Sequence, residues 1–367
     1  MRVALHTPLK PPDSPVPSGD REMARGLRRL LERLGHAVVV PHQSRVAPGV
    51  PPADAHIALE RRARAQASRL IRKWRALPAH HPERFDLWFT YHCYYRKPDW
   101  LGPIVTHALG VPYVIAEASH APRRAQGPTR LGHRAVERAL AAADLVLTVN
   151  PRDVAGVKAR LRPGARQAWL PPFIDTMPFR NPARRAAGQP PLLLAVGMMR
   201  SRDKAESYRV LARALANLDG REWRAVLVGD GPARPEIEAL MAPLGGRVRF
   251  AGAVPHAELP ALYASADIYV WPAINEAYGM AFLEAQAAGL PVVAGRTGGV
   301  PAVVADGVTG LLTPIGDADA FAAAVARLLD APDERARLGA AASARVSARH
   351  DERAAAHALA AALRTLR

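Results

Sequence analysis

Short apolar runs rich in β-branched residues alternate with longer helical patterns along the whole chain of 367 residues. The expected strands are Val3–His6, Ala37–Val40, Leu87–Thr90, Tyr113–Ala116, Leu145–Val149, Gln167–Leu170, Leu192–Val196, Ala225–Val228, Val248–Phe250, Ile268–Val270 and Pro291–Ala294. Helical patterns such as Arg21–Leu34 and Ala281–Ala288 lie between them. Because a helix separates successive strands, this alternation predicts an α/β fold, with parallel sheets covered by helices on both faces.

The chain is longer than one hydrophobic core usually serves, which favours two domains. Six prolines between Leu170 and Pro191 favour an extended linker, because proline fixes φ and blocks helix continuation. We therefore expect an N-terminal domain over 1–175, a linker over 176–190, a second domain over 191–350 and a C-terminal helix over 351–367. Two doubly wound, Rossmann-like domains joined in this way are expected to face each other across a cleft, because open α/β sheets bind ligands beyond the carboxyl ends of their strands.

Several classes of protein are disfavoured by composition. No apolar run approaches the roughly 20 residues that span a bilayer, and the opening MRVALHT lacks the apolar segment of a signal peptide. We therefore expect a cytoplasmic protein. The single cysteine, Cys93, excludes an intramolecular disulfide and a cysteine-rich metal site, and a buried core position is its favoured interpretation.

Common cofactor motifs are also missing. The sequence has no GxxxxGK[ST] and no HExxH, and the best dinucleotide candidate, Gly229-Asp230-Gly231, has Arg234 in place of the third glycine. Asp317 and Asp319 have the spacing of a metal-binding DxD motif, but they precede an expected helix, where aspartate is a good N-cap. We expect no metal and no cofactor.

The informative segment runs from Asn275 to Leu312. Glu276 follows an apolar strand, Gly279 permits close backbone approach, and a helix begins near Met280. The N–H groups at the start of this helix, over Gly279–Ala281, suit a diphosphate. Glu284 lies about one turn inside the helix, where its carboxylate is placed to accept hydrogen bonds from a vicinal ribose diol. Glu276 is placed to reach the hydroxyls of a sugar.

This segment closely resembles the signature of glycosyltransferase family 4, the retaining group 1 transferases: E-G-F-G-x-x-x-x-E-A-M-A-x-G-x-P-V-V, then G-G-x-P-E-V-V and D-G-x-T-G-L-L. The matching positions include Glu276, Gly279, Glu284, Ala285, Gly289, Pro291, Val292, Val293, Gly298, Gly299, Pro301, Val303 and Val304. The departures are Ala277 and Tyr278 for Gly-Phe, Gln286 for Met, and Ala302 for Glu. The resemblance covers roughly the last half of the chain.

The resemblance implies the GT-B fold and transfer of a glycosyl group, with retention, from a nucleoside diphosphate sugar to a cell-envelope glycan, glycolipid or other glycoconjugate. It implies that Glu284 binds the ribose, that Glu276, Met280 and Ala281 contact the rest of the donor, and that an arginine and a lysine bind the diphosphate. The usual G-R-x-x-x-x-K spacing is not kept here, and Arg200 with Lys204 is the best assignment, with Arg202 as a substitute. Protein cations and the helix dipole would then take the place of a metal.

The first half resembles the family less. Ser18-Gly19-Asp20 matches only one glycine of an S-G-G loop, so Gly19 is expected to approach the donor diphosphate, whereas Asp20 brings a carboxylate. Family members often carry a histidine after the fourth strand, near the donor sugar and acceptor. His120 is the nearest candidate and is otherwise an ordinary loop histidine; Glu117 is the next.

Positive charge is concentrated in the first half. Of the formal charge of +17, residues 1–175 carry 28 Lys and Arg against 14 Asp and Glu, and residues 176–367 carry 22 against 19. Codon bias should act evenly on both halves, so the asymmetry favours an anionic partner for the first half. We expect an anionic or lipid-linked acceptor and no nucleic acid. The basic amphipathic stretch Leu59–Leu77 suits packing on the first domain, the favoured interpretation, or peripheral contact with the inner face of a membrane.

Two other functions remain open at this point. A glycoside phosphorylase or nucleotide-sugar epimerase would share the fold but not the chemistry. A non-catalytic scaffold that binds sugar nucleotides has no need of both Glu276 and Glu284.

Overall fold

The computed structural model describes residues 1–15, 18–41, 53–180 and 189–366, and the chain divides into two compact units. Unit 1 comprises Met1–Pro171 and Glu352–Arg367, and unit 2 comprises Pro172–Asp351. Unit 1 therefore ends at Pro171 rather than at residue 175. Most of the predicted linker, at 181–188, lies outside the described residues.

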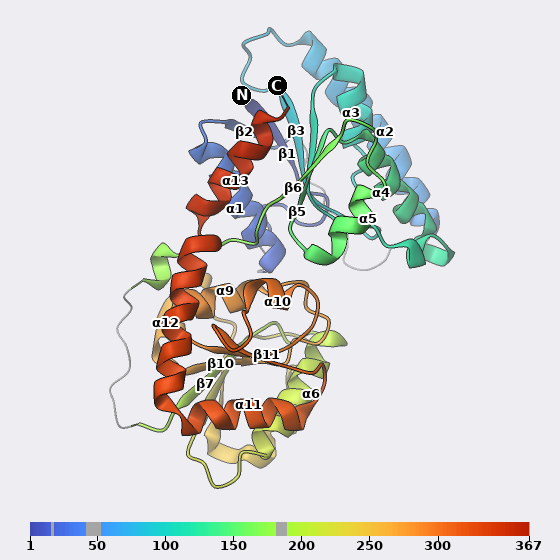
Figure 1. The fold of residues 1–367 in the computed structure, drawn as a ribbon. Coiled ribbons are helices and arrows are strands. Elements are labelled where there is room, and N and C mark those ends of the chain that lie inside the picture. The colour runs from blue at the N-terminus through green and yellow to red at the C-terminus, as the bar shows by residue number, and fades with distance from the viewer. Residues whose placement is uncertain (16–17, 42–52, 181–188, 367) are drawn as a thin grey trace. The chain divides into compact units, whose positions relative to one another are not determined.

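Unit 1 is built on one parallel sheet of six strands in the order β2-β1-β3-β4-β5-β6 (Figure 1). Its strands are β1 (Arg2–His6), β2 (Ala37–Val39), β3 (Leu87–Cys93), β4 (Tyr113–Ala118), β5 (Leu145–Thr148) and β6 (Arg166–Trp169). Its helices are α1 (Gly19–Arg33), α2 (Ala53–Ala76), α3 (Gly102–Leu109), α4 (Arg130–Ala142), α5 (Val154–Lys158) and α13 (Glu352–Arg364). The order reverses beside β1, so the switch point of this sheet lies between β1 and β3.

The C-terminal helix belongs to unit 1. Helix α13 packs on α1 through apolar residues such as Leu359 and Leu363, which are at most 5% exposed. Arg29 of α1 pairs with Glu352 at the start of α13, at 2.5 Å. The segment that the sequence marked only as a separate helix is thus an integral part of the first domain.

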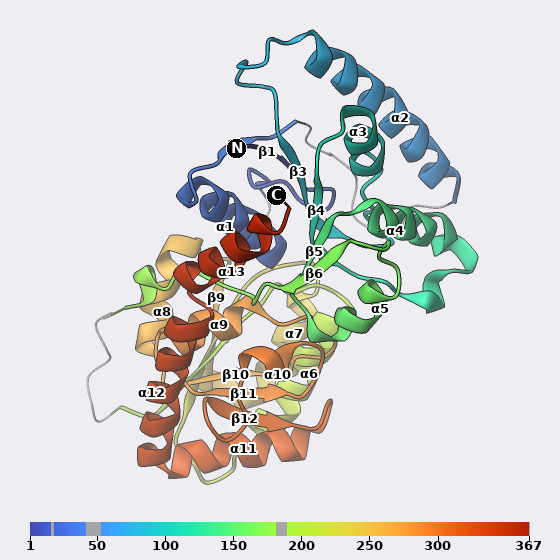
Figure 2. The same ribbon diagram turned by 45° about the horizontal axis from the view of Figure 1, so that its top comes forward.

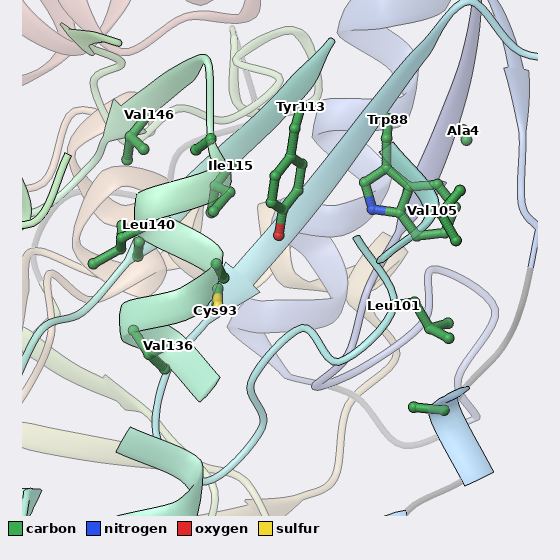
Figure 3. Close-up of a cluster of buried hydrophobic side chains, with 14 of the residues drawn as sticks. Ala4, Trp88, Cys93, Leu101, Val105, Tyr113, Ile115, Val136, Leu140 and Val146 are labelled. Carbon is green, nitrogen blue, oxygen red and sulfur yellow. The ribbon is translucent and has the colours of Figure 1, made fainter. Parts of the chain in front are cut away.

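The lone cysteine lies in the core of unit 1, as expected. Cys93 is fully buried near Tyr113, Ile115 and Val136 (Figure 3), and burial raises the pKa of its thiol to about 12. Such a thiol is a packing residue. The structure confirms the predicted core role.

The basic helix α2 packs its apolar side on the same core. Ala67 is fully buried there, and Leu70, Ile71 and Trp74 are partly buried against the cluster. The arginines between these positions are exposed. The packing interpretation of the stretch is confirmed. Within the described ranges, no helix combines the length and apolarity that crossing a membrane requires.

Unit 1 also buries a polar network around Asp99. Its carboxylate accepts hydrogen bonds from the Tyr113 hydroxyl and from the N–H groups of Leu101 and Gly102, each at 2.8 Å, and lies 3.4 Å from the His6 ring. Burial raises the pKa of Asp99, but His6 and these hydrogen bonds outweigh burial, so the pKa lies below its ordinary value. The carboxylate therefore stabilises the fold above the unfolded pKa near 4, and this contribution is lost as pH falls further.

Asp99→Asn is expected to lower the free energy of unfolding by about 1–3 kcal/mol at pH 7, the cost of unmaking buried hydrogen bonds. Urea denaturation measures this difference, and the exposed Asp219→Asn provides the control. The gap between wild type and Asp99→Asn should narrow below about pH 4; a gap that is constant with pH would contradict the charged network.

Unit 2 has a second parallel sheet of six strands, in the order β12-β11-β10-β7-β8-β9 (Figure 2). Its strands are β7 (Leu192–Val196), β8 (Arg224–Val228), β9 (Val248–Gly252), β10 (Ile268–Trp271), β11 (Val292–Gly295) and β12 (Gly310–Thr313). Its helices are α6 (Asp203–Ala216), α7 (Arg234–Met241), α8 (Leu259–Ser265), α9 (Met280–Ala287), α10 (Val300–Val303), α11 (Ala318–Asp330) and α12 (Pro332–Arg349). The chain order across the sheet reverses between β7 and β10, which makes this the switch point of unit 2. Two doubly wound α/β units confirm the predicted fold class.

Two weak motifs of unit 2 have structural roles. Asp317 caps α11 by accepting a hydrogen bond from the Ala320 N–H at 2.9 Å, which confirms the capping interpretation. A Cβ atom on Gly229 would lie 1.9 Å from the carbonyl oxygen of Gly197. The glycine turn after β8 therefore packs directly on the loop after β7.

Candidate active site

The loops that follow β7 and β10 meet at the switch point of unit 2, where open α/β sheets bind ligands. Three non-glycine residues in these loops have positive φ: Arg202 at 66°, Ala273 at 58° and Asn275 at 54°. Such conformations are costly for residues with a Cβ atom and concentrate at functional sites. Asn275 is held by a hydrogen bond from its side chain to Asp203, at 2.8 Å.

Lys204 and Glu276 bridge the two loops. The Lys204 Nζ atom lies 2.5 Å from Glu276 Oε2, and Trp271 Nε1 lies 3.4 Å from the same oxygen. The ammonium also lies 5.1 Å from the centre of the Trp271 ring, within cation–π range. Two residues predicted to contact different parts of the donor thus contact each other here, and a phosphate at this position would share Lys204 with Glu276.

The other predicted phosphate ligands lie apart from this pair. Arg200 is exposed, and in the described part of the chain its side chain forms no ion pair. Arg202 is exposed as well and immediately precedes α6. The structure brings together Lys204 and Glu276 but not Arg200, whose role stays a prediction.

The loop that carries Glu276 is fixed by glycines. Gly279 has φ 74° at the N-terminus of α9, and a Cβ atom there would lie 2.6 Å from the Phe282 ring. A Cβ atom on Gly298 would lie 1.7 Å from the carbonyl oxygen of Glu276, and one on Gly299 would lie 2.4 Å from that of Ala277. The glycine pair therefore lets the next loop pack on the backbone that positions Glu276. Met280 and Ala281 form the first turn of α9, as predicted.

Glu284 is held by two side chains to which the sequence gave no role. It is 6% exposed, and its carboxylate accepts a hydrogen bond from the Tyr263 hydroxyl at 2.8 Å and contacts the His256 ring at 3.1 Å. Burial and then the Glu284 charge raise the pKa of Tyr263 well above its ordinary value, so its hydroxyl stays a donor. An ionised carboxylate has about four acceptor positions, which leaves room for a diol. The only feature of the sequence that pointed to either of these two residues was that Tyr263 fits the family pattern.

Known proteins with similar sequences match this part of the chain. The family model described as "Glycosyl transferases group 1" matches residues 190–331. A GDP-mannose-dependent alpha-(1-6)-phosphatidylinositol monomannoside mannosyltransferase of Mycolicibacterium smegmatis is 31% identical over 260 residues, covering 66% of this chain and 67% of the relative. This chain belongs to the group 1 glycosyl transferases.

Further relatives agree with this membership. The alpha-D-kanosaminyltransferase of Streptomyces kanamyceticus is 32% identical over 64% of this chain and 66% of its own length. A D-inositol 3-phosphate glycosyltransferase of Corynebacterium glutamicum is 37% identical over 48% of this chain and 44% of its own length. The matches thus span from two thirds to less than half of these relatives, and none supports a phosphorylase, an epimerase or a scaffold.

Solved structures share the fold of this chain over its whole length. Sucrose-phosphate synthase from Thermosynechococcus elongatus has a TM-score of 0.76 at 22% identity, covering 100% of this chain and 98% of that one. HepE of Anabaena in complex with UDP-glucose has a TM-score of 0.73 at 19% identity, covering 100% of both chains. The GT-B fold class is confirmed, and the predicted cleft between its domains stays a prediction.

In unit 1 of this glycosyltransferase, Gly19 is the first residue of α1, which is capped by the Ser18 hydroxyl at 3.2 Å from the Arg21 N–H. The next residue, Asp20, contacts the ring of His92, with Oδ1 3.2 Å from Nδ1. His92 is a residue that sequence reasoning missed. Its only signal was a polar side chain near the end of an apolar strand.

His120 lies in a different part of unit 1. Its side chain is 3% exposed, and Nε2 lies 3.3 Å from Glu137 Oε1 and 3.1 Å from Arg160 Nε. Together with His133, these groups bring three potential metal ligands within 4.8 Å of one another. Arg160 Nε lies 3.3 Å from Glu137, however, so its guanidinium already supplies positive charge where a metal ion would bind. The catalytic role of His120 and the expectation of no metal both stay predictions.

Proposed function

We propose that this glycosyltransferase moves a sugar, with retention, from a nucleoside diphosphate sugar bound by unit 2. The observation that carries this is the Lys204–Glu276 pair at the switch point. Glu276 lies in the loop that leads into α9, and Glu284 lies about one turn inside that helix. Glu284 would bind the ribose and Glu276 the sugar. Lys204, Arg200 and the α9 N-terminus would stabilise the diphosphate as it gains charge on departure, in place of a metal.

The named proteins differ in the base of their nucleotide, guanine in one and uracil in another, so the base of the donor is open for this chain. One relative is named as GDP-mannose-dependent, and HepE was crystallised with UDP and with UDP-glucose. Thermal-shift measurements with UDP, GDP and ADP decide this, since a ligand at 100 times its Kd stabilises a protein by about 2.7 kcal/mol. One diphosphate should raise Tm in wild type and raise it less in Glu284→Ala. Turnover of a sugar phosphate without any nucleotide would instead support the phosphorylase.

We also propose an anionic or lipid-linked acceptor bound by unit 1. Its support is the excess of Lys and Arg in residues 1–175 and the row of exposed basic side chains on α2. Two relatives are named for phosphate-bearing inositol compounds. Peripheral contact with the inner face of a membrane through α2 would follow from charge alone, because the apolar side of the helix is packed on the core.

Acceptor KM is expected to rise steeply between about 50 and 500 mM salt, because the Debye length falls well below 10 Å over this range. Nucleotide affinity should change less. Arg69→Gln with Arg72→Gln on α2 should raise acceptor KM at low salt, whereas the exposed pair Arg213→Gln with Arg249→Gln in unit 2 should not. An acceptor KM that does not change with salt concentration would favour codon bias as the origin of the excess positive charge.

A further inference from the structure

Unit 1 contains a cavity of about 640 Å³ at the amino-terminal edge of its sheet. Its walls come from the end of α3 and the turn into β4, from the loops before β5 and β6, and from the residues that follow α13. This edge is opposite to the one that carries His92 and Glu117, near the carboxyl ends of β3 and β4. Ligand pockets usually have volumes of about 300–1,000 Å³, so the cavity is large enough for a small metabolite.

Two glycine turns shape the walls of the cavity. Gly110 ends α3 with φ 64°, and Gly164 precedes β6 with φ 84°, so both have the left-handed conformation that favours glycine. A Cβ atom on either residue would have no heavy atom within 4 Å beyond those of the glycine and its chain neighbours. Both turns therefore present bare backbone to open space, where a ligand can approach closely.

The charged and titratable lining of the cavity comprises two arginines, a histidine and one aspartate. The Asp144 carboxylate is fixed, because its Oδ2 atom accepts a hydrogen bond from the Tyr113 N–H at 2.7 Å and its Oδ1 atom pairs with Arg162. Arg166 and His107 are exposed, and among the described residues neither side chain has a partner for a hydrogen bond or an ion pair. Two guanidinium groups thus accompany one carboxylate, and one of the two is available to bind an anion.

This combination favours an anion that also carries hydroxyl groups. A guanidinium matches the oxygen atoms of a phosphate with paired hydrogen bonds, and the His107 ring can donate another. Asp144 retains acceptor positions for hydroxyl groups, because an ionised carboxylate has about four. Apolar residues complete the lining and suit the C–H face of a sugar ring: Pro103, Val111, Pro112, Ala142 and Leu366. An apolar ligand would leave the charged groups without partners.

We propose that this cavity binds a phosphate monoester of a sugar or polyol. Arg166 and His107 bind the phosphate, and Asp144 accepts hydrogen bonds from the hydroxyl groups. The ester takes no part in the transfer reaction, since the proposed donor site lies in unit 2. It acts instead as an effector that stabilises unit 1.

Binding in this cavity connects the last helix to the rest of unit 1. Thr365 and Leu366 follow α13 and form one wall, whereas the other walls come from the loops before β4, β5 and β6. An ester in contact with both parts stabilises α13 in its place on α1, because a ligand that binds only the folded arrangement favours that arrangement.

Histidine NMR of the full chain tests the site with D-glucose 6-phosphate. The His107 signal should shift saturably with the ester and not with D-glucose, and inorganic phosphate should bind more weakly than the ester. His256, which contacts Glu284, reports on the donor site. A shift of His256 in place of His107 would overturn the proposal, as would the absence of any His107 shift. Equal affinity for inorganic phosphate would overturn the assignment to a sugar or polyol ester.

Calorimetric titration of variants locates the ester. Arg166→Gln and His107→Glu should raise the Kd for D-glucose 6-phosphate by about tenfold or more, the size of one hydrogen bond to a charged group. Arg134→Gln, which changes an exposed arginine of α4, is the matched control and should leave this Kd unchanged. Glu284→Ala should leave it unchanged as well. Loss of ester binding in Glu284→Ala with unchanged binding in Arg166→Gln would assign the ester to the donor site and overturn the cavity.

Hydrogen exchange of the α13 amides, measured by mass spectrometry, tests the link to the last helix. D-glucose 6-phosphate at saturation should slow exchange over Glu352–Arg364 in wild type and should not do so in Arg166→Gln at the same concentration. Unchanged exchange in wild type saturated with the ester would overturn the proposed stabilisation.

Discussion

Glu276→Gln is expected to lower kcat for glycosyl transfer by about 10²–10³-fold, the usual cost of removing one preorganised polar group that stabilises the transition state. The amide keeps the size of the side chain but cannot hold the Lys204 ammonium through a full ion pair, now 2.5 Å long. Both the proposed contact with the donor sugar and the placement of Lys204 should therefore be weakened. Initial rates at saturating donor measure kcat, and KM for the donor should change less.

The exposed Glu222→Gln in the same unit is the matched control, with wild-type rates expected. Lys204→Gln should also lower kcat, and the double variant should lose less than the product of the two single effects, because each partner acts through the other. Independent, multiplicative losses would show that Lys204 and Glu276 contact separate parts of the donor. If the double variant kept near wild-type turnover, the phosphate site would have to lie elsewhere, and Arg202 would be the first alternative.

Glu284→Ala is expected to weaken nucleotide binding by about 1.5–3 kcal/mol, the size of a hydrogen bond to a charged group. That is roughly a 10- to 150-fold rise in Kd. The carboxylate is 6% exposed and already oriented by Tyr263 and His256, so little freedom is lost when a diol binds. Isothermal titration with the stabilising nucleoside diphosphate measures the change.

Tyr263→Phe separates orientation from contact. It removes one hydrogen bond to Glu284 but leaves the carboxylate, so Kd should rise by a smaller factor, about fivefold for roughly 1 kcal/mol. Circular dichroism should show both variants folded. An unchanged Kd in folded Glu284→Ala would remove this residue from the donor site.

Local patterns predicted the sheets well because a buried parallel strand is a short apolar run wherever it occurs. The strand that was not predicted, β12, spans Gly310–Thr313: it begins at the last glycine of a loop-like D-G-x-T-G motif and contains an apolar run of only two residues. The last helix was found, but its place in unit 1 depends on contacts across more than 300 residues, such as Arg29 with Glu352. Periodicity along the chain carries no such information.

The same difference between local patterns and long-range contacts applies to the candidate site. Glu276 and Glu284 were predictable because their strand–loop–helix context is contiguous in sequence. The pairing of Glu276 with Lys204 was not, since 72 residues separate them and only the adjacency of β10 and β7 joins them. His92 was missed because a polar side chain near the end of an apolar strand is a weak signal, and its positive φ of 62° cannot be read from residue types.

The return of the chain to unit 1 has a consequence for biosynthesis. Unit 2 is one continuous segment, so it is fully specified when Asp351 leaves the ribosome, whereas unit 1 still lacks α13. Domains fold as units during synthesis, usually from the N-terminus onward. Here the second domain can be completed first, while the surface of α1 that α13 covers is exposed on the nascent chain. The first domain to be translated is the last to be finished.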